Sequence, residues 1–268
     1  PAVAPADLLE PWVGLPALNA LANLSWALWL LGHPEQALCR AREAADLAQK
    51  LTVPHLSLCF VEYALAELAS FRREPAEVEA RAEALVPLAA EQGFRMFEAL
   101  GRFLLAWAQN ERSGAGEAVA QMRQALTTRR DLQALAGLPS HHALLASAYL
   151  RADRIVEGLA TLKDALAHQG DQRIMEAELH RLKGELLRRH GVPDAEVEEH
   201  LEKALDVARR QGAKSLELRA AVSLARLRAH QGRSSEGREL LAAVYESFTE
   251  GHDTQDLRDA RAALAEAG

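Results

Sequence analysis

Histidines and carboxylates are the side chains in this sequence whose spacing could support metal chemistry. Glu176 and His180 lie four residues apart, as do Glu196 and His200, so on a helix each pair would share one face. A protein zinc site needs three or four ligands, and neither pair has an evident third. We therefore interpret both pairs as solvated helix faces and expect no metal and no other cofactor.

The remaining candidates for catalysis are equally isolated. Adjacent residues on a helix project about 100° apart, so His141 and His142 are poorly placed to chelate one ion. Ser140 fits the first turn of a helix better than a nucleophile beside His141. Cys39 has no histidine within helical reach, and the sequence holds neither a G-x-G-x-x-G nor a Walker A loop. These absences predict that the chain is not an enzyme.

These side chains lie on predicted amphipathic helices, and the helices belong to a sequence pattern that recurs along the chain. A small or short residue begins each copy of the pattern, at spacings of 41, 40, 40, 39 and 40 residues: Ala37, Val78, Ala118, Gly158, Val197 and Gly237. Apolar residues follow four and seven positions later in every copy, as one helix face requires. A small residue lies twelve positions before most of them, where it would let two antiparallel helices approach closely. The pattern predicts helix-turn-helix repeats of about forty residues.

Breakers separate the predicted helices. Segments such as "GHPE" (32–35) and "HGVPD" (190–194) would turn the chain within a pair. Glycines would end the second helices at Gly93, Gly137, Gly170, Gly212 and Gly251. No segment alternates with the period of a strand. We predict an all-α, right-handed α-solenoid: a lead-in segment at 1–16, six repeats at 17–251 and a C-terminal capping helix at 252–268.

Composition limits the partners. The formal net charge is −7, which does not attract phosphate backbones, so no nucleic acid is expected. The longest apolar run, "WALWLL" (26–31), is far shorter than the roughly 20 residues that span a bilayer, so no membrane is expected. Two cysteines fit core positions in a reducing compartment, and we predict a cytoplasmic protein. The sequence opens without Met, which suggests a fragment of a longer multidomain protein.

Two groups of segments carry a family resemblance. "LSWALWLLGHPEQA" (24–37) and "LASAYLRADRIVEG" (145–158) resemble the tetratricopeptide pattern. "ELHRLKGELL" (178–187), "AKSLELRAAVSLARL" (213–227) and "FTEGHDTQDLRDARAAL" (248–264) resemble the MalT/LuxR-type helical-repeat region at the C-terminus of bacterial nucleotide-cyclase or protein-kinase/AAA-ATPase fusion signalling proteins. The resemblance implies a non-catalytic interaction and regulatory module that relays partner binding to an upstream cyclase, kinase or ATPase domain.

The tetratricopeptide register implies that the first helix of each repeat lines a concave face. In the first three repeats that face would hold aromatic residues: Trp26, Trp29, Phe60, Tyr63, Phe103 and Trp107. In the last two it would hold glutamates and arginines: Glu178, Glu185, Arg181, Arg188, Arg219 and Arg226. Aromatic and arginine side chains are favoured anchors in interfaces. We predict a protein or peptide partner with apolar residues at one end and acidic residues at the other.

Other interpretations stay open. The aromatic column could fill the core or contact the upstream domain, because an aromatic stripe at helical spacing is commonly core. The module could also be a small-ligand sensor of a transcription-activator-like ATPase. A third alternative is self-association into a homodimer through the aromatic face.

Overall fold

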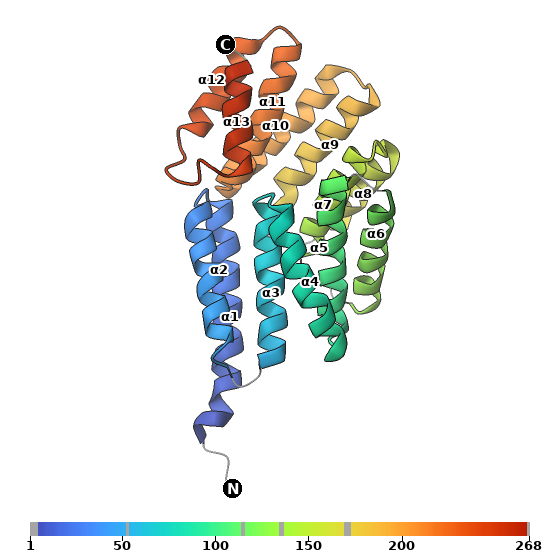
Figure 1. Cartoon of the computed structure of the whole chain (residues 1–268). Helices are drawn as coiled ribbons and strands as arrows, with labels where there is room; N and C mark the ends of the chain where they lie inside the picture. Colours follow the sequence, from blue (N-terminus) through green and yellow to red (C-terminus); the bar gives the residue numbers. More distant parts are fainter. Residues whose placement is uncertain (1–4, 52–53, 114–115, 134–136, 169–172, 267–268) are drawn as a thin grey trace. The chain divides into compact units, whose positions relative to one another are not determined.

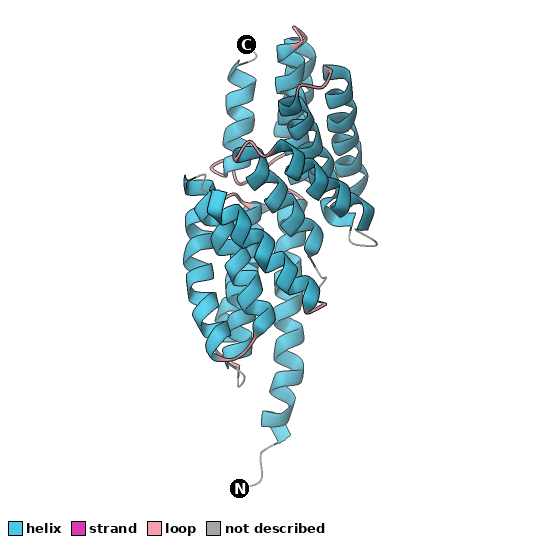
Figure 2. Cartoon of the chain, turned by 90° about the vertical axis from the view of Figure 1, so that its right-hand side faces the viewer, coloured by secondary structure: helices cyan, strands magenta, loops and turns pink. Residues whose placement is uncertain are grey.

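The chain is helical throughout the part that the structure describes. The structure is a computed structural model that describes residues 5–51, 54–113, 116–133, 137–168 and 173–266. Within those ranges it contains thirteen α-helices, one 3-10 turn and no strand (Figures 1 and 2). The all-α helical-repeat prediction is confirmed.

The helices alternate between the two members of each predicted repeat. The odd-numbered helices are the first members: α1 (Pro5–Leu30), α3 (Pro54–Phe71), α5 (Arg95–Ser113), α7 (Leu138–Arg151), α9 (Glu176–His190) and α11 (Lys214–His230). The even-numbered helices are the second members: α2 (Pro34–Ala48), α4 (Pro75–Glu91), α6 (Gly116–Asp131), α8 (Ile155–His168), α10 (Asp194–Gln211) and α12 (Ser234–Tyr245). The final helix, α13 (Gln255–Glu266), lies within the predicted cap.

The described residues form two compact units. Unit 1 comprises Pro1–Trp29, Pro34–Ser113 and Ala120–Ala134, and unit 2 comprises Leu30–His33, Gly114–Val119 and Leu135–Gly268. Within each unit an odd helix packs against its even neighbours and also against the next odd helix, as α3 does with α5 and α9 with α11. That double contact is how tandem helix pairs bury a continuous core.

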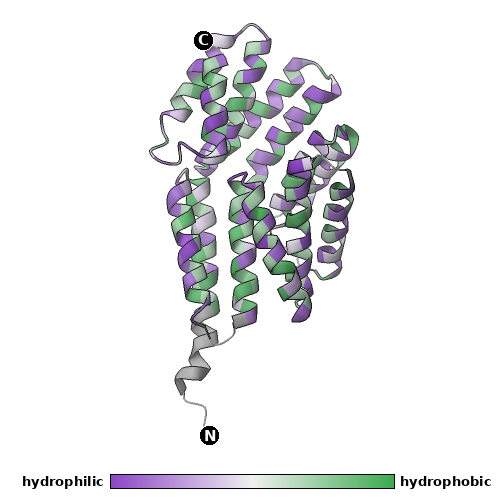
Figure 3. Ribbon diagram, viewed as in Figure 1, coloured by the Kyte–Doolittle hydropathy of each residue, from purple (hydrophilic) through white to green (hydrophobic). Residues whose placement is uncertain are grey.

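In unit 1 the core lies between α3, α4 and α5. Cys59, Leu85 and Leu100 are buried together there, with Phe60 and Tyr63 packed against them. Apolar and polar residues form separate bands along each helix in Figure 3, which is the amphipathic pattern that the sequence predicts.

In unit 2 the small residues of the repeat permit the close helix contacts that their spacing predicts. A Cβ added to Gly237 would lie 2.9 Å from both the Cα and the carbonyl oxygen of Ala225, so α11 and α12 touch backbone to backbone. A Cβ on Gly184 would lie 2.7 Å from a methyl carbon of Leu201. The same core includes Leu257 and Ala260 of α13.

The helix ends also follow the glycine pattern. Gly212 has a φ of 65° at the end of α10, and Ala213 N donates to Ala208 O at 2.9 Å, so the chain turns there before α11. Of the predicted exit glycines, Gly170 lies outside the described residues. Residues 1–4 of the predicted lead-in lie outside them too, and α1 runs from Pro5 across the rest. Among the described helices, none is both long and apolar enough to cross a bilayer.

Candidate functional site

The predicted binding residues lie on one face of each odd helix. We call this the odd-helix face: the four columns that begin at Asn19, Ala22, Trp26 and Trp29 and recur in each later odd helix. In unit 1 the aromatic members differ in exposure. Trp29, Phe103 and Trp107 are 2%, 0% and 3% exposed, whereas Trp26, Phe60 and Tyr63 are half-buried. Half of the predicted aromatic set therefore retains solvent-accessible surface.

Two of the half-buried aromatic side chains, Trp26 and Tyr63, are held by ring contacts between α1, α3 and α5. The ring centroids of Trp26 and Tyr63 are 6.2 Å apart in an edge-to-face arrangement, and those of Tyr63 and Phe97 are 6.5 Å apart. Trp26 Nε1 donates to Ala64 O at 3.4 Å. These contacts fix the rings before any partner arrives, which lowers the entropy cost of binding on them.

Tyr63 also faces a buried charged pair of residues. Desolvation raises the pKa of the Tyr63 phenol well above its ordinary value, and the charge of Glu67 raises it further, while Arg129 opposes the rise. Glu67 and Arg129 are each only 2% exposed. The aromatic part of the odd-helix face therefore has a polar interior that sequence reasoning missed at Arg129, because that residue comes from α6, an even helix.

Helix α5 carries buried polar atoms that have no hydrogen-bond partner among the described residues. Trp107 Nε1 and both side-chain amide atoms of Asn110 are buried and have no partner among the described residues. The two residues are three apart on α5 and so share the odd-helix face. An unpaired buried polar group costs roughly 1 to 3 kcal/mol, so native proteins keep few of them without a purpose.

The arginines of unit 2 are joined in an ion network. Arg181 Nε and Nη2 donate to the two carboxylate oxygens of Glu178 at 2.8 and 2.7 Å, and its Nη1 lies 3.4 Å from Ser223 Oγ. Arg219 Nε and Nη2 lie 2.9 and 2.8 Å from Asp256 Oδ2, and Arg219 Nη1 lies 3.7 Å from Glu178. The structure thus brings Arg181 and Arg219 together around one carboxylate.

The network favours the charged form of Arg181. Burial alone would lower the pKa of Arg181, but the charge and hydrogen bonds of Glu178, with Glu185 and Asp256, raise it above its ordinary value. Asp256 was not among the predicted site residues, because it belongs to α13 and only the fold brings it to Arg219. The other two predicted arginines, Arg188 and Arg226, are exposed, and Arg188 Nη2 lies 3.2 Å from Glu185.

The two histidines considered for metal binding come together across two helices, and the interpretation of their pairs as solvated helix faces is wrong for His180, which is buried. The rings of His180 on α9 and His200 on α10 are nearly parallel, with centroids 5.8 Å apart, and both Nδ1 atoms are buried without a partner among the described residues. Burial and the nearby Lys203, His200 and Lys183 charges lower the pKa of His180 from 6.5 to about 4. No group of three or more potential ligands for a metal occurs in the described part of the chain.

The two thiols differ in environment. Cys39 on α2 is exposed, whereas Cys59 on α3 is fully buried. Burial raises the pKa of the Cys59 thiol, and the charge of Glu62 adds to the rise. A buried, protonated thiol is a poor nucleophile, so Cys59 is a core residue.

Together these features define a tandem helical-repeat protein of the tetratricopeptide-like class. No family model matches the sequence, and a search of curated proteins gave no match. Among solved structures, the chain is similar to NprR in complex with its cognate peptide NprX, with a TM-score of 0.67 and 13% sequence identity. The alignment covers 99% of this chain and 73% of the NprR chain. At that identity the likeness shows a shared fold.

Proposed function

We propose that this chain is a non-catalytic module that binds a segment of a protein or peptide on its odd-helix face and relays that binding to a regulatory output. The observation that carries the proposal is the pairing of accessible aromatic rings with unsatisfied polar atoms in unit 1. Trp26, Phe60 and Tyr63 offer apolar surface, and the unpaired donors and acceptor of Trp107 and Asn110 lie buried on the same face, where a partner reaches them only if the side chains around them move. A polypeptide segment carries the matching groups, because its side chains can be apolar and each backbone amide has one donor and one acceptor.

The fold supports the same proposal. NprR, which has the same fold, was solved with a cognate peptide, and tandem helix pairs generally offer extended binding surfaces. In unit 2 the exposed Arg188 and Arg226 favour acidic residues in the partner. Arg181 and Arg219 would join them only by exchanging Glu178 or Asp256 for a partner carboxylate.

The biological setting follows from the sequence resemblance. We propose that the module belongs to a bacterial cytoplasmic signalling protein of the MalT/LuxR-type repeat group. Its partner would be either a separate protein or peptide, or the upstream cyclase, kinase or ATPase domain of the same protein. Self-association through the aromatic residues stays an alternative, and its signature would be a mass that rises with concentration in light scattering.

The test is selection from a random peptide library displayed on phage, followed by fluorescence polarisation with the selected peptides. We expect Trp26→Ala and Phe60→Ala to weaken binding at least about tenfold, because truncating an interface anchor removes about 2 kcal/mol or more. Val156→Ala is the matched control, since Val156 is an exposed apolar residue on the even helix α8. Circular dichroism checks that each variant keeps its helicity.

Two results would overturn the proposal. One is the absence of any enriched sequence. The other is a set of peptides whose affinities are the same for the wild type, the two aromatic variants and the control.

A further inference from the structure

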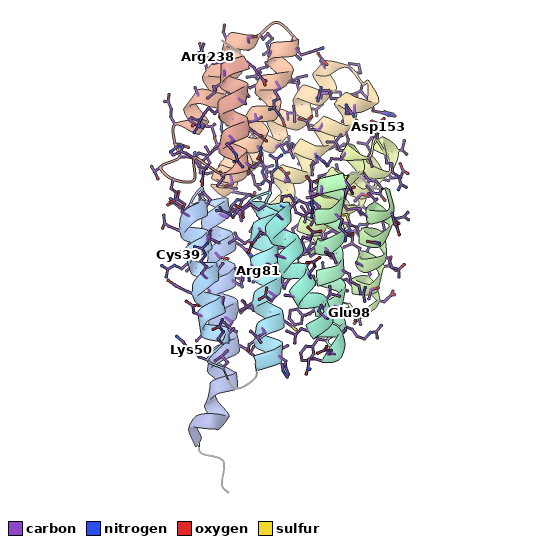
Figure 4. The ribbon with its side chains drawn as sticks, in the orientation of Figure 1. Cys39, Lys50, Arg81, Glu98, Asp153 and Arg238 are labelled. Carbon is purple, nitrogen blue, oxygen red and sulfur yellow. The ribbon has the colours of Figure 1, made fainter. Side chains whose placement is uncertain are left out.

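A cleft lies between α5 and α6 in unit 1, away from the odd-helix face. Its volume is about 540 Å³, within the range of ligand-binding clefts. It is lined from α5 by Arg95, Glu98, Ala99, Arg102, Leu105 and Gln109, and from α6 by Gln121, Gln124, Ala125 and Thr128. Glu98, near the beginning of α5, is labelled in Figure 4.

The cleft uses the opposite side of α5 from the predicted binding columns. Glu98, Arg102, Leu105 and Gln109 follow one another by three or four residues, so they form a single stripe on the helix. Helical rotation of 100° per residue places this stripe roughly opposite the one that contains Trp107. The cleft is therefore a separate candidate site, and it does not depend on the odd-helix face.

The preceding repeat has larger apolar residues at two of the positions that line the cleft. Forty residues earlier, α4 has Leu85 and Leu88 at the positions of Ala125 and Thr128. Leu85 is fully buried, and Leu88 packs against the same core cluster. Ala125 and Thr128, which line the cleft, are smaller and less apolar than these leucines.

The polar residues change at the same time. In the earlier repeat Arg81, labelled in Figure 4, lies 3.5 Å from Glu62, an ion pair that links α4 to α3. The corresponding residues of the later repeat are Gln121 and Arg102, which cannot form that pair. Arg102 instead contacts Glu98 of its own helix at 2.8 Å. Within the residues that the structure describes, no ion pair therefore joins the α5 wall of the cleft to the α6 wall.

Several groups in the cleft are available to a ligand. Among the described residues, no side chain pairs with the guanidinium of Arg95 or with the side-chain amides of Gln109, Gln121 and Gln124. All four residues are exposed. Arg95 and Arg102 are positive and Glu98 is negative, so the lining carries a net charge of +1 in a chain whose net charge is −7.

We propose that this cleft binds an extended, acidic peptide segment. Arg95 would receive a carboxylate at one end, because guanidinium groups bind carboxylates by charge-assisted hydrogen bonds. The glutamine amides would bond to backbone N–H and C=O groups, and the small Ala99 and Ala125 on the floor would let the backbone approach. From Arg95 to Gln109 the helix rises roughly 21 Å, which matches about six residues of extended chain.

The shape of the cleft favours a peptide over a compact anion. Convergent cations would suit a phosphate group, but here one arginine is unpaired and the other already contacts Glu98. Amide side chains spread along the helices suit a ligand that has donors and acceptors at regular intervals. A main chain in extended conformation has that spacing.

The test uses a synthetic array of short peptides with Asp or Glu at one end and Ala, Ser or Asn elsewhere, matched to peptides with Lys in place of the acid. The best acidic peptide is then labelled for fluorescence polarisation. We expect Arg95→Gln to weaken its binding about tenfold, because the variant loses the charge-assisted hydrogen bond to the peptide carboxylate. Arg123→Gln is the matched control, because Arg123 is exposed on α6 outside the cleft and undergoes the same charge change.

A second variant tests the cleft itself. Ala125→Leu with Thr128→Leu restores the residues that fill the preceding repeat, and it should abolish binding while helicity is retained. If that variant does not fold, Gln121→Ala with Gln124→Ala serves instead and should weaken binding. Equal binding of acidic and Lys peptides would overturn the proposal, as would equal effects of Arg95→Gln and Arg123→Gln. Loss of binding in Trp26→Ala but not in the cleft variants would overturn the cleft and support the odd-helix face.

Discussion

Gly237 provides the sharpest test of how the helix pairs are packed. At an unhindered helix position, Gly→Ala stabilises by about 1 kcal/mol, because alanine has the higher helix propensity. At Gly237 the added Cβ would lie 2.9 Å from two backbone atoms of Ala225. Carbon atoms pack at about 3.5 to 4.0 Å, so α11 and α12 would have to separate by roughly 0.5 to 1 Å.

The magnitude follows from these opposing effects. Overpacking of a close contact costs about 1 to 3 kcal/mol, and the gain in propensity offsets about 1 kcal/mol of it. We therefore expect Gly237→Ala to lower the free energy of unfolding by about 1 kcal/mol. Urea titration followed by far-UV circular dichroism measures that free energy.

Gly158 is the matched control. A Cβ there would lie 2.9 Å from the two methyl carbons of Leu186, which can move by rotation of a side chain. We expect Gly158→Ala to leave the free energy of unfolding unchanged or to raise it by up to about 1 kcal/mol. If Gly237→Ala is as stable as Gly158→Ala or more so, the backbone contact between α11 and α12 is not as close as described.

Three further predictions concern buried polar groups. Asp256→Asn should lower the free energy of unfolding by about 3 kcal/mol in urea titration, because it removes the buried carboxylate that pairs with the half-buried Arg219, and the double variant with Arg219→Met should lose less than the two single losses combined. The folded-state pKa of His180 is lowered to about 4, so the unfolded chain binds its proton first, and the free energy of unfolding should fall by about 3 kcal/mol as the pH drops from 6.5 to 4. The His180→Gln variant should show a much flatter dependence in pH-resolved urea titrations, and a slope equal to that of the wild type would contradict the shift. Asn110→Leu should raise the free energy of unfolding by about 1 to 3 kcal/mol, measured by tryptophan emission in urea, and a loss of stability would mean that its amide is already satisfied.

The sequence predicts the helix order well because the same spacing of small residues recurs in every copy of the repeat. One copy of the small-residue spacing would be weak, but the column from Ala37 to Gly237 agrees in six copies. Each copy fixes which side of a helix meets its neighbour, and a glycine such as Gly212 fixes where the helix ends. These are local requirements of a helix pair, so a single sequence contains them.

The candidate site is harder to predict because it depends on how much each face is covered. The register places Trp26 and Trp107 in the same column, yet one is half-buried and the other is 3% exposed. How much of a helix face is buried depends on helices that are distant in the sequence. The periodicity of one helix does not show which of them pack on that face. The same reason explains why Asp256 was missed beside Arg219.

The cleft and the histidine pair also depend on relations between helices. His180 and His200 were each paired with a glutamate of the same helix in the sequence, whereas their ring contact joins α9 to α10. The cleft could have been found by comparing repeats, since Ala125 and Thr128 stand where the previous copy has leucines. That comparison requires knowing which positions of the repeat normally carry large apolar side chains.

The contrast between the two thiols has a practical consequence for handling the protein. Only Cys39 is exposed, so a maleimide dye or spin label would attach at a single position on α2 and report on one defined point. In air-oxidised buffer the same thiol could link two chains through an intermolecular disulfide. Such a covalent dimer would imitate self-association in light scattering and would disappear on addition of a reductant, whereas a dimer held by aromatic residues would not.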